Sequence, residues 1–213
     1  MSLFNDEIKK QLKDILQKLQ NNVTIAYFTQ EFECDTCKET HEFLEEFVEL
    51  SDKLELKIYD FKADKDMVEK YHVDMIPAII LLDSDGKDYG IKFYGLPGGY
   101  EINSFISGLL EVSGQEQPVE DELLKRINAI NKDVHIKVFI TLACPHCPGA
   151  VSNAHKLAYL SNNVAADMVE SSTFTTEAIK YNVSAVPKIV INGEHELIGD
   201  QPLEKYLEII EKL

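Results

Sequence analysis

The sequence predicts an α/β protein built from two tandem copies of one unit, and three observations support this. The four cysteines form two CxxC pairs, Cys34–Cys37 and Cys144–Cys147, that begin 110 residues apart. Each pair is followed, 43 residues after its first cysteine, by a proline that opens an apolar run, namely Pro77 and Pro187. Tyrosine and valine before each proline repeat in register as well, so we interpret the chain as an internal duplication.

In the first copy, the periodicity of apolar residues predicts each element in turn. Leucine and isoleucine at helical spacing predict a helix over 8–19, and β-branched and aromatic residues predict a strand over 23–28. A helix is expected to begin at Cys34, followed by a strand over 54–60, a short helix ending near Tyr71 and a strand over 78–82. The turn at 83–86 leads to a strand over 91–94 and a final helix over 100–112.

The second copy repeats this order. We expect helices over 119–130, 145–160, 174–180 and 202–212, and strands over 134–140, 163–169, 188–192 and 195–198. The polar segment 113–118 contains Gly and Pro and has no periodicity, which places the domain boundary there and gives units 1–113 and 114–213. Strands 78–82 and 188–192 are almost wholly apolar, as in mixed sheets that lie between two helix layers, a three-layer α/β/α arrangement.

Composition excludes several classes of function. Of the 213 residues 45% are hydrophobic and 27% charged, enough for a globular core, and the net charge of −16 would repel nucleic acid and anionic membranes. The N-terminal segment alternates charged and apolar residues, which is unlike a signal peptide or a membrane span. We therefore expect a cytoplasmic protein, in which cysteines are not structural disulfides by default.

A CxxC pair at the start of a helix favours thiol chemistry. Unpaired N–H groups and the helix dipole stabilise a thiolate there, so Cys34 and Cys144 are predicted to attack disulfides. Cys37 and Cys147, one turn further in, are predicted to resolve the mixed disulfide. A zinc site shared by both pairs is the alternative, but zinc ribbons usually hold their pairs about 15–20 residues apart, and inert buried cysteines would not recur ahead of the same proline.

The combination of strand, CxxC and helix with a distant proline resembles the thioredoxin fold. More narrowly, two such units in one chain resemble the protein disulfide oxidoreductases of thermophilic archaea and bacteria, often labelled glutaredoxin-like. The resemblance implies cis peptide bonds at Ile76–Pro77 and Val186–Pro187 and a substrate-binding role for these four residues. Thioredoxin also keeps a buried carboxylate six residues before its first cysteine, whereas this chain has Phe28 and Val138 there. Proton transfer is therefore expected to use another group or water.

The two sites are predicted to differ in reactivity. His146 lies between the cysteines of the second pair and, when protonated, would favour the Cys144 thiolate; an exposed histidine with no electrostatic effect is the alternative. The first pair lies among Glu31, Glu33, Asp35 and Glu39, with only Lys38 to offset them nearby. Residues 1–113 carry 12 basic and 23 acidic side chains. We expect Cys34 to be the weaker nucleophile at neutral pH.

These observations predict a dithiol–disulfide oxidoreductase that reduces, forms or isomerises protein disulfides, mostly at the second site. The resemblance implies reduction by an NADPH-dependent flavoprotein of the thioredoxin reductase type, and the chain itself suggests no bound cofactor or metal. One alternative is an electron relay to a peroxiredoxin, as in alkyl hydroperoxide reductase flavoproteins, although that resemblance would predict only one intact CxxC. The other is a chaperone module that binds thiols or metal without turnover.

Overall fold

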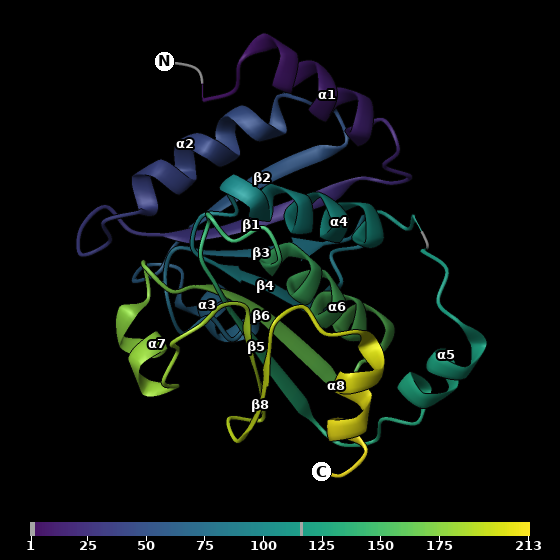
Figure 1. Ribbon diagram of the computed structural model, residues 1–213. Helices are drawn as coiled ribbons and strands as arrows, with labels where there is room; N and C mark the ends of the chain where they lie inside the picture. The colour runs from purple at the N-terminus through teal and green to yellow at the C-terminus, as the bar shows by residue number, and fades with distance from the viewer. Residues whose placement is uncertain (1–2, 116) are drawn as a thin grey trace.

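The computed structural model describes residues 3–115 and 117–213, and the first unit follows the predicted order (Figure 1). Its helices are α1 (Asp6–Leu16), α2 (Cys37–Val48), α3 (Lys65–Lys70), a 3₁₀ turn η1 (Gly99–Glu101) and α4 (Ile102–Val112). Its strands are β1 (Val23–Thr29), β2 (Leu54–Asp60), β3 (Ala78–Leu82) and β4 (Asp88–Tyr94).

The second unit repeats the same elements. Its helices are α5 (Asp121–Asn128), α6 (Cys147–Leu160), α7 (Thr175–Lys180) and α8 (Leu203–Ile210). Its strands are β5 (Val134–Ile140), β6 (Val164–Glu170), β7 (Lys188–Ile191) and β8 (His195–Ile198). All residues of β3 and β7 are buried, as their apolar residues predict, and the buried Lys188 of β7 donates from Nζ to the Tyr181 carbonyl oxygen.

The eight strands form one mixed sheet in the order β2-β1-β3-β4-β6-β5-β7-β8. Each half of this order is the same four-strand pattern, which is the structural counterpart of the sequence repeat. The sequence repeat does not indicate how the two units join. In the structure, β4 of the first unit pairs in parallel with β6 of the second, with Lys92 opposite Asp167. Both strands would otherwise be open sheet edges, and pairing them satisfies their backbone hydrogen bonds.

The sheet lies between two helix layers of unequal size, which confirms the predicted tandem thioredoxin-fold architecture. One face packs against α1, α2, α4, α5, α6 and α8, and the opposite face packs against the short helices α3 and α7. In β1, Ile25 and Tyr27 point into the larger core, and Ala26 and Phe28 point into the smaller one. This alternation is the period-two pattern of a strand buried on both faces.

Helix α6 also joins the two units, because it packs against α4 and β4 of the first unit (Figure 1). Its His155 is buried at this junction, with Nε2 3.2 Å from the Lys92 carbonyl oxygen and its ring 4.7 Å from that of Phe93. Burial lowers the pKa of His155 to about 4, so it is neutral at pH 7. No helix in the described ranges is long and apolar enough to cross a membrane.

Candidate functional site

Both cysteine pairs are disulfide-bonded, Cys34 with Cys37 and Cys144 with Cys147, and the Cα atoms of each pair are 5.5 Å apart. The helices were predicted to begin at the first cysteine or just after it, but they begin at the second. The first cysteine of each pair therefore lies two residues before the N-cap residue of its helix, next to a helix start whose first N–H groups have no partner within the helix. The helix predicted over 145–160 would have begun at Pro145, whereas α6 begins at Cys147 and has Pro148 in its first turn.

The four sulfurs differ in exposure. Cys37 is 2% exposed and Cys147 is fully buried, as expected of resolving cysteines. Cys34 is half-buried, whereas Cys144 is only 8% exposed. The cysteine predicted to attack is therefore more accessible at the first site than at the second, a difference that the sequence did not predict.

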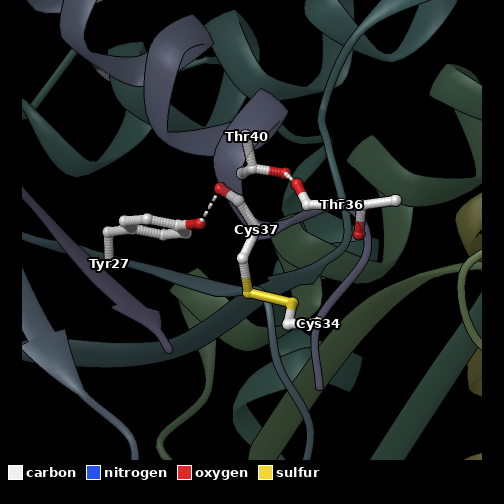
Figure 2. The surroundings of a disulfide bond; sticks show 5 residues. All are labelled: Tyr27, Cys34, Thr36, Cys37 and Thr40. Atoms are coloured by element: carbon white, nitrogen blue, oxygen red, sulfur yellow. Dashed lines mark hydrogen bonds between the residues drawn. A yellow bond between two sulfur atoms is a disulfide. The ribbon is translucent and has the colours of Figure 1, made fainter. Parts of the chain in front are cut away.

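Two side chains fix the start of α2 at the first site (Figure 2). The buried hydroxyl of Tyr27 donates a 2.6 Å hydrogen bond to the carbonyl oxygen of Cys37. The Thr40 hydroxyl donates to the Thr36 carbonyl at 2.8 Å. At the second site, the Tyr206 hydroxyl donates to the carbonyl of Ala150 at 3.1 Å, so a tyrosine anchors the first turns of both helices.

The predicted proline loops lie directly before β3 and β7. The Ile76–Pro77 and Val186–Pro187 peptide bonds are both cis. Ile76 lines the same cavity as Cys34, and Val186 packs against the larger core. The role of these four residues in binding substrate stays a prediction.

At the second site, His146 is the N-cap residue of α6 and is exposed. In the sequence it is the nearest ionisable group, but the structure adds Asp200, whose carboxylate lies against Gly149 so closely that a β-carbon at residue 149 would collide with it. Burial raises the pKa of Asp200, and the charge of nearby His146 partly opposes that rise. The second site thus has one acidic group that the sequence did not reveal.

The first site contains a cation that the sequence also did not reveal. Lys62, distant in sequence, lies 3.1 Å from the Glu33 carboxylate and 4.7 Å from the ring centre of Phe32. Lys38, the nearby cation in the sequence, lies 3.8 Å from Glu42. Part of the acidity next to Cys34 is therefore offset by a residue that follows the end of β2.

Glu101 is a functional candidate that the sequence-based prediction missed. Its side chain is fully buried in η1, where the Ser104 hydroxyl donates a hydrogen bond to Oε2. Within the described residues, Oε1 has no hydrogen-bond partner. Burial raises the pKa of Glu101 to about 7. The 3₁₀ turn η1 packs against α6, and its Tyr100 N–H donates to the carbonyl of Leu142, two residues before Cys144, so Glu101 belongs to the part of the first unit that borders the second site.

One feature of the sequence could have pointed to Glu101, namely that it has no other acidic residue near it in the sequence. It is the one acidic residue in segment 89–110, which is mostly apolar. A buried carboxylate costs free energy unless it is neutral or paired, so a lone glutamate in such a segment points to a special role. Among residues 3–115 and 117–213, no group of three or more His, Cys, Asp or Glu side chains is arranged to hold a metal ion.

Comparisons with known proteins agree with this geometry. The model of the thioredoxin domain family matches residues 134–212. A structure of the alkylhydroperoxide reductase protein AhpF from Enterococcus faecalis is 31% identical, with a TM-score of 0.92, and covers 98% of this chain and 100% of that one. A protein disulfide oxidoreductase from Aeropyrum pernix is 27% identical, with a TM-score of 0.89, and covers 97% of this chain and 92% of that one.

Among curated proteins, the AhpF protein of Staphylococcus aureus alkyl hydroperoxide reductase is 27% identical over 193 residues. The match covers 90% of this chain and 34% of that protein. The chain thus spans about a third of the length of the curated relatives that it matches.

Proposed function

This chain belongs to the family of tandem thioredoxin-fold thiol–disulfide oxidoreductases that includes the N-terminal part of AhpF, and we propose that it transfers electron pairs between protein dithiols and disulfides. The observation that carries this proposal is the pair of disulfides, each ending at the first residue of a helix at equivalent places in the repeat. Neither disulfide ties distant parts of the chain together, as a structural staple would.

The exchange follows from the positions of the sulfurs. Once the disulfide is reduced, the thiolate of Cys34 or Cys144 attacks one sulfur of a substrate disulfide and releases the other as a thiol. The resolving thiolate of Cys37 or Cys147 then attacks the enzyme sulfur of the mixed disulfide. This releases the second substrate thiol and restores the internal disulfide, so two electrons pass to the substrate.

The resolving step needs a proton acceptor for a buried thiol. The positions six residues before the first cysteines are occupied by Phe28 and Val138, which cannot accept a proton. Glu101 is buried in η1, which packs against α6, and its pKa of about 7 suits reversible proton transfer at neutral pH. We propose that Glu101 serves the second site in this way.

We also propose that the second site carries most of the exchange. The exposed imidazole of His146 stands at the N-cap of α6, and its protonated form favours the Cys144 thiolate. Glu31, Glu33, Asp35 and Glu39 oppose ionisation of Cys34.

As electron donor we propose a flavoprotein of the thioredoxin reductase type, and as substrates protein disulfides, in the cytoplasm. A second candidate function is an electron relay to a peroxiredoxin. The observation that favours it is that several curated relatives are AhpF proteins of alkyl hydroperoxide reductase. The presence of two complete CxxC pairs favours the broader oxidoreductase function.

Reduction of insulin disulfides by dithiothreitol tests the proposal. The full chain should accelerate the reaction, and replacing all four cysteines by serine should abolish the acceleration. A chain that binds insulin but gives no acceleration would instead indicate a chaperone. Coupling to a purified flavoprotein reductase, with either insulin or an oxidised peroxiredoxin as acceptor, then separates the two candidate functions.

A further inference from the structure

The first site opens into a cleft of about 770 Å³ that both units enclose. On the first unit's side, the cleft is lined by Glu33–Thr36, Glu39, Ile76 and Leu96. On the second unit's side, it is lined by Thr141–Ala143, Glu170 and Ser172–Phe174. Because Cys34 lines this cleft, a substrate disulfide that reaches its sulfur lies between the two units.

Hydrogen bonds fix the residues of the second unit that line the cleft. The backbone N–H of Tyr100 donates to the Leu142 carbonyl at 3.1 Å, which ties segment 141–143 to the first unit. Glu170 at the end of β6 is 4% exposed, and its carboxylate accepts backbone hydrogen bonds from Ser172 at 3.1 Å and Thr173 at 2.6 Å. These contacts fix a carboxylate in the wall opposite the first cysteine pair.

The charged side chains that line the cleft are all acidic. Four of its lining residues are acidic, namely Glu33, Asp35, Glu39 and Glu170. The described residues that line it include no lysine, arginine or histidine. Within the described chain, Lys62 is the one cation in ion-pair range of these carboxylates, and it reaches only Glu33. A cleft with low-dielectric walls concentrates such a field and attracts counter-charge.

We propose that the first site acts on disulfides carried by basic polypeptide segments, whose lysine or arginine side chains lie against the carboxylates of this cleft. This inference rests on the proposed thiol–disulfide exchange and adds a substrate class for one of the two sites. In each turnover, the reduced Cys34–Cys37 dithiol is oxidised to the disulfide. The substrate disulfide is reduced to two thiols, which take up the two protons that the dithiol loses.

Single-turnover kinetics test the proposal in the full chain with Cys144→Ser and Cys147→Ser, which leaves only the first site. The protein is reduced with dithiothreitol, freed of it, and mixed with one of three peptides. The peptides share one intramolecular disulfide and differ only in flanking lysine, serine or glutamate. Each rate constant is divided by that for dithiothreitol with the same peptide, which removes differences in intrinsic reactivity.

At low ionic strength, we expect the lysine peptide to react about tenfold faster than the glutamate peptide, and added salt should reduce this ratio. The double variant Asp35→Asn with Glu39→Gln should lower the ratio at least about threefold. Glu42→Gln is the matched control, since Glu42 lies on α2 but outside the cleft, and should leave the ratio unchanged. The rates with the lysine and glutamate peptides are compared within each variant, because the substitutions can also alter the reactivity of Cys34, and such a change affects both rates equally.

A charge-independent rate with all three peptides would overturn the inference while leaving the proposed exchange intact. A lysine preference that persists undiminished in the double variant would also overturn it. Failure to reduce even the serine peptide would instead contradict the proposed function of the first site.

Discussion

The backbone N–H of Tyr100, in the first unit, donates a 3.1 Å hydrogen bond to the carbonyl oxygen of Leu142, two residues before Cys144 in the second unit. The neighbouring Gly99 has a φ of +57°, and a β-carbon there would collide with the same carbonyl. One unit therefore helps to position the active-site loop of the other.

Gly99→Ala should impair the second site selectively. The added methyl group must displace the 141–143 loop, and we expect disulfide reduction by that site to fall about tenfold or more, a loss of the size that misplaced reacting groups produce. The measurement is insulin reduction in the Cys34→Ser, Cys37→Ser background. Gly86→Ala is the matched control, because Gly86 also has a positive φ, +78°, but has no atom within 4 Å of an added β-carbon.

Both alanine variants should lose about 1–2 kcal/mol of unfolding free energy from the unfavourable backbone conformation. The control should nevertheless keep its reduction rate. Equal rates in the two variants would show that the Gly99–Leu142 contact does not position the second site.

Glu101→Gln should change how stability depends on pH. The pKa of Glu101 is raised from its ordinary 4.5 to about 7, so the folded state holds a proton that the unfolded state has released between these values. The wild-type chain should therefore lose stability as pH rises from 4.5 to 7, by roughly 3 kcal/mol at most. Glutamine cannot ionise, so urea unfolding should show the variant more stable at pH 8 and similar at pH 4.5. A constant difference across this range would contradict a buried, titrating Glu101.

Asp200→Asn should make Cys144 more reactive. The Asp200 carboxylate lies against Gly149 in the first turn of α6, where its negative charge counteracts the stabilisation of the Cys144 thiolate by the helix dipole and His146. Removing this charge should therefore stabilise the thiolate by about 0.3–1 kcal/mol. Alkylation of Cys144 by iodoacetamide at pH 7, measured in the Cys147→Ser background, should become about two- to fivefold faster. Glu204→Gln, on the exposed side of α8, removes one charge elsewhere in the second unit and should have little effect. A slower or unchanged rate for Asp200→Asn would show that its charge does not act on Cys144.

The fold was largely predictable because the duplication presents the sequence pattern of each helix and strand twice, once in each unit. The equal distances from Cys34 to Pro77 and from Cys144 to Pro187 reveal two units even where single elements are weakly patterned. The continuous sheet was not predictable, because the pairing of Lys92 with Asp167 depends on which strand edges meet after folding. Sequence periodicity describes the faces of a strand and carries no information about the partner at its edge.

The candidate site was predictable where the residues are close in sequence. The cysteine pairs and His146 share two short motifs, whereas Lys62, Glu101 and Asp200 reach the sites from distant segments. Their effects depend on distances and burial that exist only in the folded chain. Each of them changes the electrostatics on which the predicted difference between the sites depends.

The reduction potential of each CxxC pair, measured in full-length variants that keep only one pair, tests the central claim most directly. We predict two values separated by more than about 30 mV, a tenfold difference in equilibrium constant, with the Cys144–Cys147 pair the more oxidising because its thiolate is better stabilised. Equal potentials, or a more oxidising Cys34–Cys37 pair, would contradict two differently poised sites.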